Sequence, residues 1–125
     1  MKVIEVVAAI IQKENQYLAT QRGYGDFKGF WEFPGGKIEF GESHEVALKR
    51  EIREELGINI SIEKFICTTD YDYSSFHLTM HCYLCNIVSG EIELREHIAI
   101  RWLNPYELND VKWLPADKEI IDKLV

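Results

Sequence analysis

The stretch 36–58 reads GKIEFGESHEVALKREIREELGI and contains three glutamates at helical spacing. Each residue of an α-helix advances about 100° around the axis, so Glu51, Glu54 and Glu55 would share one arc of the surface. Like charges at these spacings destabilise an isolated helix by about 0.2–0.5 kcal/mol per pair, and a hard cation with oxygen ligands would neutralise them. The stretch therefore predicts a divalent-metal site. The alternative is a solvated helix face that carries only charge.

The ends and the buried face of this helix can be predicted from the same residues. Ser43 is suited to be the N-cap, and Gly57 to end the helix in a left-handed conformation. Leu48, Ile52 and Leu56 form an apolar stripe at helical spacing. The three glutamates lie beside this stripe on a helical wheel, so we expect half-buried carboxylates that face the body of the protein.

The length and net charge of the chain limit its domain number and the partners it can bind. A chain of 125 residues is expected to form one domain, residues 1–125, that buries a core without disulfides. A net charge of -7 argues against sequence-independent binding to a nucleic-acid polymer. The apolar run 3–11 is too short to span a membrane and contains Glu5, which favours a buried strand in a cytoplasmic protein.

Three cysteines, an odd number, do not suggest a disulfide framework. Cys82 and Cys85 form a CxxC within an alternating run, and residues three apart on a strand point to opposite faces. We therefore expect two packing cysteines rather than a zinc or redox motif. His77 and His81, in the same run, are expected at the strand surface.

The remaining pattern predicts a mixed α/β (α+β) domain. Strands are expected over 3–11, 17–21, 60–73, 76–88 and 98–103, with a turn at Asn15 and a loop over 23–29. Pro34-Gly35-Gly36 is expected to break the chain before the glutamate helix. A short helical piece is predicted from Asn104-Pro105 and a last helix from Pro115 toward Leu124. Periodicity alone leaves the strand order open.

The spacing of the fixed positions resembles the signature of the Nudix hydrolases. Every fixed position of that signature is matched, by Gly36, Glu42, Arg50, Glu51, Ile52, Glu54, Glu55, Gly57 and Ile58. The resemblance implies the Nudix fold, in which a mixed β-sheet lies between helices and the signature forms a loop-helix-loop.

The resemblance also implies a magnesium-dependent reaction on a phosphate anhydride, with Mn²⁺ as a substitute. The implied metal ligands are the backbone carbonyl of Gly35 and the carboxylates of Glu51, Glu54, Glu55 and Glu96. A glutamate would act as the general base, either Glu51 or Glu54, with Glu96 as the alternative. Arg50 lies four residues before Glu54, where it could hold that carboxylate in place.

Within the family, the chain is similar to the MutT type of nucleoside triphosphate pyrophosphohydrolase. The stretches 31–37, 96–102 and 114–124 carry this similarity. It implies that Phe33 stacks on the base and that Asp117 reads the base edge, although Phe33 could also be core and Asp117 could cap the last helix. Arg22 and Lys37 are candidates to hold phosphates or sugar.

Asp117 bears on the choice of base. The enzymes of this type that remove oxidised guanine triphosphate have Asn at this position, which offers a donor and an acceptor. An ionised Asp offers acceptors only and favours the amine of cytosine, as in the CTP pyrophosphohydrolase subgroup, whereas a protonated Asp in a dry pocket also permits oxidised purines.

We therefore expect hydrolysis of a CTP-like, dCTP-like or oxidised nucleoside triphosphate to the monophosphate and pyrophosphate, in nucleotide-pool sanitation and DNA repair. The small-molecule nucleotide is the expected partner, and the chain is expected to be a monomer or a homodimer. Two alternatives stay open. One is a Nudix hydrolase of ADP-ribose, a sugar nucleotide or a dinucleoside polyphosphate, and the other is a catalytically silent nucleotide-binding module.

Overall fold

The computed structural model describes residues 1–124. The strands are β1 (Lys2–Lys13), β2 (Gln16–Arg22), β3 (Trp31–Glu32), β4 (Gly35–Lys37), β5 (Asn59–Asp72), β6 (Phe76–Ser89) and β7 (His97–Leu103). The helices are α1 (His44–Leu56), the 3-10 turn η1 (Leu108–Asp110) and α2 (Pro115–Ile121).

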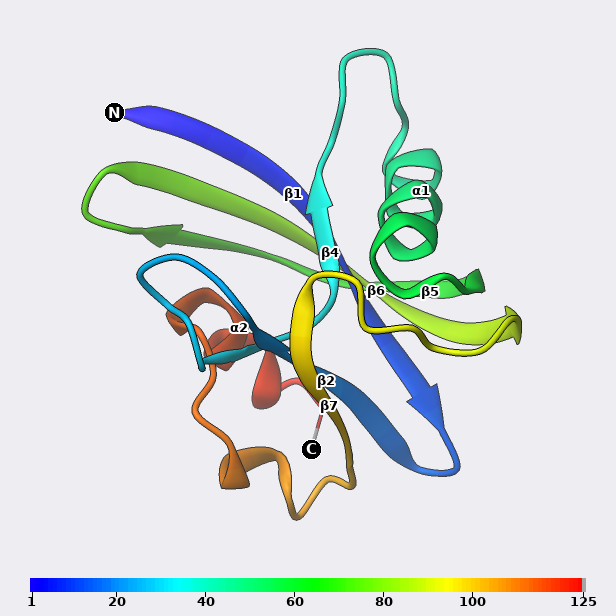
Figure 1. The fold of residues 1–125 in the computed structure, drawn as a ribbon. Coiled ribbons are helices and arrows are strands. Elements are labelled where there is room, and N and C mark those ends of the chain that lie inside the picture. The colour runs from blue at the N-terminus through cyan, green and yellow to red at the C-terminus, as the bar shows by residue number, and fades with distance from the viewer. Residues whose placement is uncertain (125) are drawn as a thin grey trace.

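The strands form one mixed sheet that lies between the two α-helices (Figure 1). The central pair, β1 and β6, is parallel, and the other named strand pairs are antiparallel. The order is β3-β2-β1-β6-β5, with β4 added beside β1 and β7 beside β2. The predicted fold class, a mixed sheet sandwiched between helices, is confirmed.

Each face of the sheet has its own hydrophobic core. Alternate residues of β1 point to opposite faces, so Val7 and Ala9 pack under α1 while Ala8 and Ile10 pack under α2. The same alternation places Cys85 in the α1 core and Cys82 in the α2 core. The prediction that the CxxC thiols lie on opposite faces is therefore confirmed.

Helix α1 begins and ends where the sequence predicts. The Ser43 hydroxyl accepts a hydrogen bond from the Val46 N–H at 3.2 Å, which satisfies one of the unpaired donors of the first turn. Gly57 ends the helix with φ 69°, and its N–H donates to the Arg53 carbonyl at 3.0 Å. These caps fix the length of the helix that carries the glutamates.

Three predictions about segments outside the long strands differ from the structure. Pro34-Gly35-Gly36 was expected only to break the chain, but Gly35 and Gly36 open β4 and pair with β1. Glycines are weak strand formers, and this strand exists because the β1 backbone lies beside it. The last helix ends at Ile121, before the predicted Leu124, and the helical piece after Asn104-Pro105 is the 3-10 turn that begins at Leu108.

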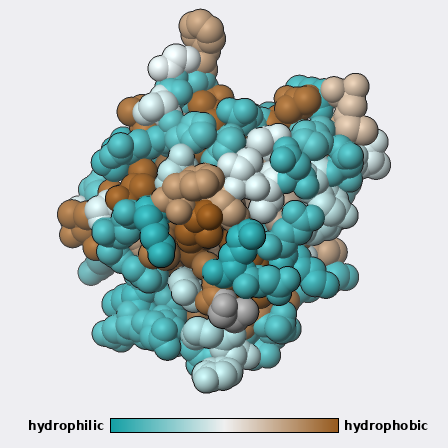
Figure 2. Space-filling view, turned by 180° about the vertical axis from the view of Figure 1, so that it is seen from behind, coloured by the Kyte–Doolittle hydropathy of each residue, from teal (hydrophilic) through white to brown (hydrophobic). Residues whose placement is uncertain are grey.

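On the face turned away from the viewer in Figure 1, apolar side chains reach the surface in patches between hydrophilic ones (Figure 2). Large exposed apolar residues such as Phe40 and Tyr106 belong to separate loops of the chain. Within residues 1–124, neither α-helix has the length and apolar character that a membrane span needs.

Candidate active site

The three α1 glutamates are brought to one side of the helix but differ in depth. The Glu55 residue is 7% exposed, whereas the side chain of Glu51 is 17% exposed and that of Glu54 is 60% exposed. The prediction of half-buried carboxylates is confirmed for Glu51 and wrong for the other two. Glu55 follows the apolar stripe into the protein, whereas Glu54 lies on the solvent side of the same arc.

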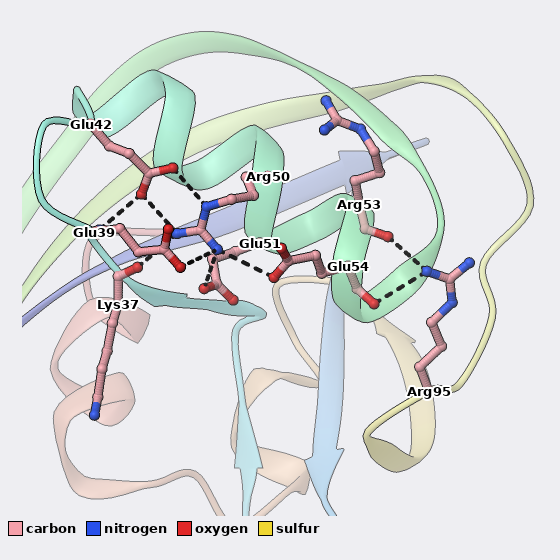
Figure 3. A network of polar contacts seen from close by, with 8 residues as sticks. All are labelled: Lys37, Glu39, Glu42, Arg50, Glu51, Arg53, Glu54 and Arg95. Carbon is pink, nitrogen blue, oxygen red and sulfur yellow. Dashed lines mark hydrogen bonds and ion pairs between the residues drawn. The ribbon is translucent and has the colours of Figure 1, made fainter.

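Arg50 connects several groups on this face of α1 through hydrogen bonds (Figure 3). Its guanidinium donates two hydrogen bonds to the Glu42 carboxylate, at 2.6 and 2.8 Å. The same group donates to Glu51 at 2.9 Å and to Glu54 at 3.2 Å. Arg50 also donates to the carbonyl of Lys37 at 3.0 Å, so one side chain ties β4, the following loop and two of the helix carboxylates together.

Glu55 is a carboxyl group in an environment that disfavours its charge. Burial, followed by the charges of Glu51, Glu96 and Glu32, raises the pKa of Glu55 to about 9. Its Oε2 atom is buried and lacks a hydrogen-bond partner among residues 1–124. A buried carboxylate oxygen without a partner, surrounded by other carboxylates, is the donor set that a hard divalent cation completes. The residues present therefore fit a metal.

The two β4 glycines bring the backbone close to these carboxylates. A Cβ at Gly36 would collide with the carboxyl group of Glu51, and a Cβ at Gly35 would collide with the Val7 backbone. Glycine is therefore required at both positions for packing reasons. The close approach also explains why the Gly35 backbone lies near enough to Glu55 to act on its pKa.

A cleft of about 290 Å³ runs beside this cluster. Its wall includes Gly35 and Gly36, which adjoin the carboxylates, together with Arg22 and Asp117. The apolar part of the wall is formed by Val6, Phe27, Phe33, Tyr73, Phe76, Leu78, Met80 and Leu114. A mostly apolar cleft with a few polar groups is the usual form of a small-molecule site.

Asp117 lies inside the protein at the cleft wall, at 4% exposure. Its Oδ2 atom accepts a hydrogen bond from the Phe33 N–H at 2.8 Å. Burial, followed by the charge of Glu32, raises the pKa of Asp117 to about 8. The N-cap of α2 is Leu114, so Asp117 is not the cap of the last helix.

Phe33 is deeply buried, and its ring stacks on Trp113 with centroids 4.6 Å apart. It is at once a core residue and part of the cleft wall. A second aromatic group lines the cleft, in which Tyr73 lies between Phe27 at 5.5 Å and Phe76 at 5.1 Å. Sequence reasoning missed this group because its members lie on a loop, a strand end and the next strand.

Three other candidate residues, Arg22, Glu96 and Lys37, differ in how they lie relative to the site. Arg22 lines the cleft but is held by Glu32 through hydrogen bonds of 2.8 and 3.1 Å. Glu96 is exposed on the loop before β7, close enough to raise the pKa of Glu51 and Glu55. Lys37 is exposed, and its side chain points away from the Arg50 cluster (Figure 3).

Sequence reasoning also missed Glu32 and His97. Glu32 lies between Arg22 and His97, whose Nε2 atom is 3.5 Å from Glu32 Oε2. The His97 side chain is only 3% exposed, and its Nδ1 atom has no hydrogen-bond partner within the described part of the chain. Glu32 precedes Phe33 directly, so the stretch 31–37 was the signal that could have revealed it.

Carboxylates on a helix that follows a glycine-containing loop, beside a mostly apolar cleft, are the arrangement of a metal-dependent enzyme that acts on a small molecule. The chain belongs to the Nudix hydrolase family, since the family model described as NUDIX domain matches residues 6–123. Nudix hydrolases generally use a divalent metal, in agreement with the donor set described above.

Known relatives match over almost the whole chain. A CTP pyrophosphohydrolase of Escherichia coli (strain K12) is 37% identical over 98% of this chain and 91% of its own. An 8-oxo-dGTP diphosphatase of Haemophilus influenzae is 36% identical over 99% of this chain and 93% of its own. The crystal structure of a MutT NUDIX hydrolase from Burkholderia pseudomallei, 26% identical, superposes with a TM-score of 0.91 and full coverage of both chains.

Proposed function

We propose that the protein hydrolyses a nucleoside triphosphate to the monophosphate and pyrophosphate, with Mg²⁺ as cofactor and Mn²⁺ as a substitute. The observation that carries this proposal is the cleft itself. Its wall joins the β4 glycines beside the carboxylates to the buried Asp117 and the aromatic side chains. A nucleotide laid along it would place its phosphates at the charged part and its base in the apolar part.

The proposed metal ligands are the Gly35 carbonyl and the carboxylates of Glu51, Glu54, Glu55 and Glu96. Bound divalent ions supply charge neutralisation of the phosphates and lower the pKa of a bound water. The unpartnered Oε2 atom of Glu55 supports this assignment.

The remaining groups position the glutamates and move a proton. Arg50 holds Glu51 and Glu54 on one side and Glu42 on the other, which restricts the carboxylates to one arrangement. One of these glutamates takes a proton from the attacking water, whose oxygen bonds to the β-phosphorus as the α-phosphate leaves. We favour Glu51 or Glu54 for this role, and Glu96 is the alternative.

Asp117 is the proposed reader of the base, with Phe33 and the neighbouring aromatic side chains as the stacking surface. A protonated carboxyl group offers one donor and one acceptor side by side. Cytosine presents an acceptor, N3, beside a donor, the N4 amine, so a neutral Asp117 can form a bidentate pair with it. The same donor can also meet a carbonyl of an oxidised purine. Arg22 and Lys37 remain candidates for contacts with phosphate or sugar.

The relatives named as acting on CTP and on 8-oxo-dGTP support this substrate class. On this basis we propose that residues 1–125 form one domain that acts as a monomer or homodimer in cytoplasmic nucleotide-pool sanitation, and so in the protection of DNA. The substrate is a small molecule, with no nucleic-acid polymer or membrane as a partner.

A panel of nucleotides tests the proposal. CTP, dCTP, 8-oxo-dGTP, the canonical purine triphosphates and ADP-ribose would be incubated with Mg²⁺, and products would be resolved by anion-exchange chromatography. We expect monophosphate and pyrophosphate, with the highest kcat/KM for a cytosine or oxidised-purine triphosphate. Preferential cleavage of ADP-ribose, or tight nucleotide binding without any product, would overturn it.

A further inference from the structure

A second cluster of metal-ligating side chains lies under the N-terminal end of α1. Glu5 of β1, His44 of α1 and His81 of β6 each offer one ligand atom, and these atoms lie within 4.8 Å of one another. We propose that this trio is a Zn²⁺-type transition-metal site that is separate from the catalytic carboxylates. Two imidazoles and a carboxylate are a ligand set that Zn²⁺ accepts, with a water as fourth ligand.

The hydrogen bonds of the two imidazoles support a metal role. His81 Nδ1 is 2.8 Å from the Thr68 hydroxyl, and His44 Nδ1 is 2.8 Å from the Tyr83 hydroxyl. A histidine that binds a metal through one nitrogen has its other nitrogen held by such a partner, which fixes the ring and its tautomer. Both rings are therefore held through Nδ1, which leaves the Nε2 atoms to bind the metal.

The Nε2 atom of His81 gives independent support for a metal at this cluster. His81 Nε2 is buried, and nothing in residues 1–124 hydrogen-bonds to it, although Glu5 Oε1 lies 3.7 Å away. A buried polar atom without a partner is costly. His81 was predicted at the strand surface, but its side chain is only 15% exposed because the His44 ring covers it, with centroids 4.2 Å apart.

The cluster can close around an ion without a change in the fold. In a tetrahedral site with bonds of about 2.0 Å, ligand atoms are about 3.3 Å apart. The trio is somewhat wider than this, and the Glu5 side chain is 53% exposed and free to rotate inward. His44 is the first residue of α1, so a rotation of its side chain leaves the helix intact.

The proposed site and the catalytic site lie on different sides of β1. Gly35 and Gly36 pair with β1 through β4, whereas His81 belongs to β6, which pairs with the other edge of β1. The ligand chemistry differs as well. Carboxylate and carbonyl oxygens suit Mg²⁺, and imidazole suits Zn²⁺ and Co²⁺, so the two sites can be loaded independently.

The test is a titration of the metal-free protein with Zn²⁺ in excess Mg²⁺, which occupies the oxygen-ligand site. We expect one Zn²⁺ per chain by calorimetry, a raised unfolding temperature, and a visible absorption spectrum of low coordination number when Co²⁺ replaces Zn²⁺. Absence of Zn²⁺ binding under these conditions would overturn the proposal.

Variants then locate the bound ion. Glu5→Gln, His44→Gln and His81→Gln should each weaken Zn²⁺ binding by more than the about 10- to 100-fold that follows loss of an outer partner, whereas Thr68→Val and Tyr83→Phe should fall within that range. His77→Gln is the matched control, since His77 also lies on β6 but bonds to Asp70 and Asp72.

If the His44 or His81 variant fails to fold, Glu5→Gln tests the proposed site instead. The Glu5 side chain is exposed, so its replacement should leave the fold intact. Glu54→Gln should keep full Zn²⁺ affinity. Equal affinity in the wild type and Glu5→Gln, equal loss in His77→Gln, or loss in Glu54→Gln would each contradict the proposed site.

Discussion

The carboxyl group of Glu51 lies so close over Gly36 that a single Cβ at residue 36 would collide with it. The contact fixes the position of a helix glutamate relative to the β4 backbone. The absence of a side chain at Gly36 therefore leaves room for Glu51, a proposed metal ligand. Any larger residue at position 36 must displace the Glu51 carboxyl group.

Gly36→Ala should accordingly impair catalysis more than folding. The group that must move is the end of the Glu51 side chain, which is flexible, so the fold is retained. A misplacement of a reacting group by about 1 Å can lower the rate about 100-fold, and we expect a loss of at least this order in kcat/KM. Steady-state kinetics and circular dichroism of the variant would measure the two effects separately.

Gly35→Ala is the matched control for that variant. Its Cβ would meet the Val7 backbone, which cannot move without disturbing the central strand. We expect a loss of about 1–3 kcal/mol in the free energy of unfolding, as is typical of overpacking. If Gly36→Ala lost as much stability as Gly35→Ala while retaining its activity, the proposed role of Gly36 in positioning Glu51 would be wrong.

Arg50→Lys tests whether the Arg50 guanidinium positions the carboxylates of α1. Lysine keeps the charge but cannot form the two hydrogen bonds to Glu42 while also reaching Glu51 and Glu54. We expect activity to fall about 10- to 100-fold, with weaker Mg²⁺ binding measured by calorimetry. Lys49→Arg is a control on the adjacent position, where the native side chain bonds to the exposed Glu45. Equal activity of Arg50→Lys and the wild type would contradict this role.

Asp117→Asn tests the buried carboxyl group through the pH dependence of stability. Its pKa is raised from 3.8 to about 8 by burial, so between these values the unfolded chain binds fewer protons than the folded one. This group therefore contributes stability that is full below about pH 4 and is lost as pH rises toward about 8, by at most about 1.4 kcal/mol per pH unit.

Asparagine does not titrate, so the variant should gain stability relative to the wild type as pH rises. Urea unfolding of both proteins across this pH range measures the difference. Parallel stability curves would show that Asp117 is ionised in the folded protein. Below about pH 8 the variant should also keep its preference for the same base, because the amide offers the same donor and acceptor as a neutral carboxyl group.

The sequence predicted the parts of this protein that depend on local order. Helix α1 begins at the predicted Ser43 cap and ends at Gly57, because caps are decided within one turn. The strands around the Asn15 turn and the separation of Cys82 from Cys85 followed from alternation.

What the sequence did not reveal depends on contacts between distant segments. Strand β4 forms because β1 pairs with it, and Tyr73 enters the cleft because α2 and the loop 23–29 pack around it. The different depths of Glu54 and Glu55 are also set by the sheet beneath the helix. A helical wheel gives direction around the axis but not the height of the neighbouring surface.

We propose that the α1 glutamates cleave the nucleotide between the α- and β-phosphates, and ³¹P NMR of the products formed with Mg²⁺ identifies the bond that is broken. For the wild type with CTP or 8-oxo-dGTP, we predict monophosphate and pyrophosphate, and for a folded Glu54→Gln variant, no turnover. Glu45→Gln, on the same helix, should match the wild type. Release of diphosphate and phosphate, or near-normal turnover by Glu54→Gln, would contradict this role of the α1 glutamates.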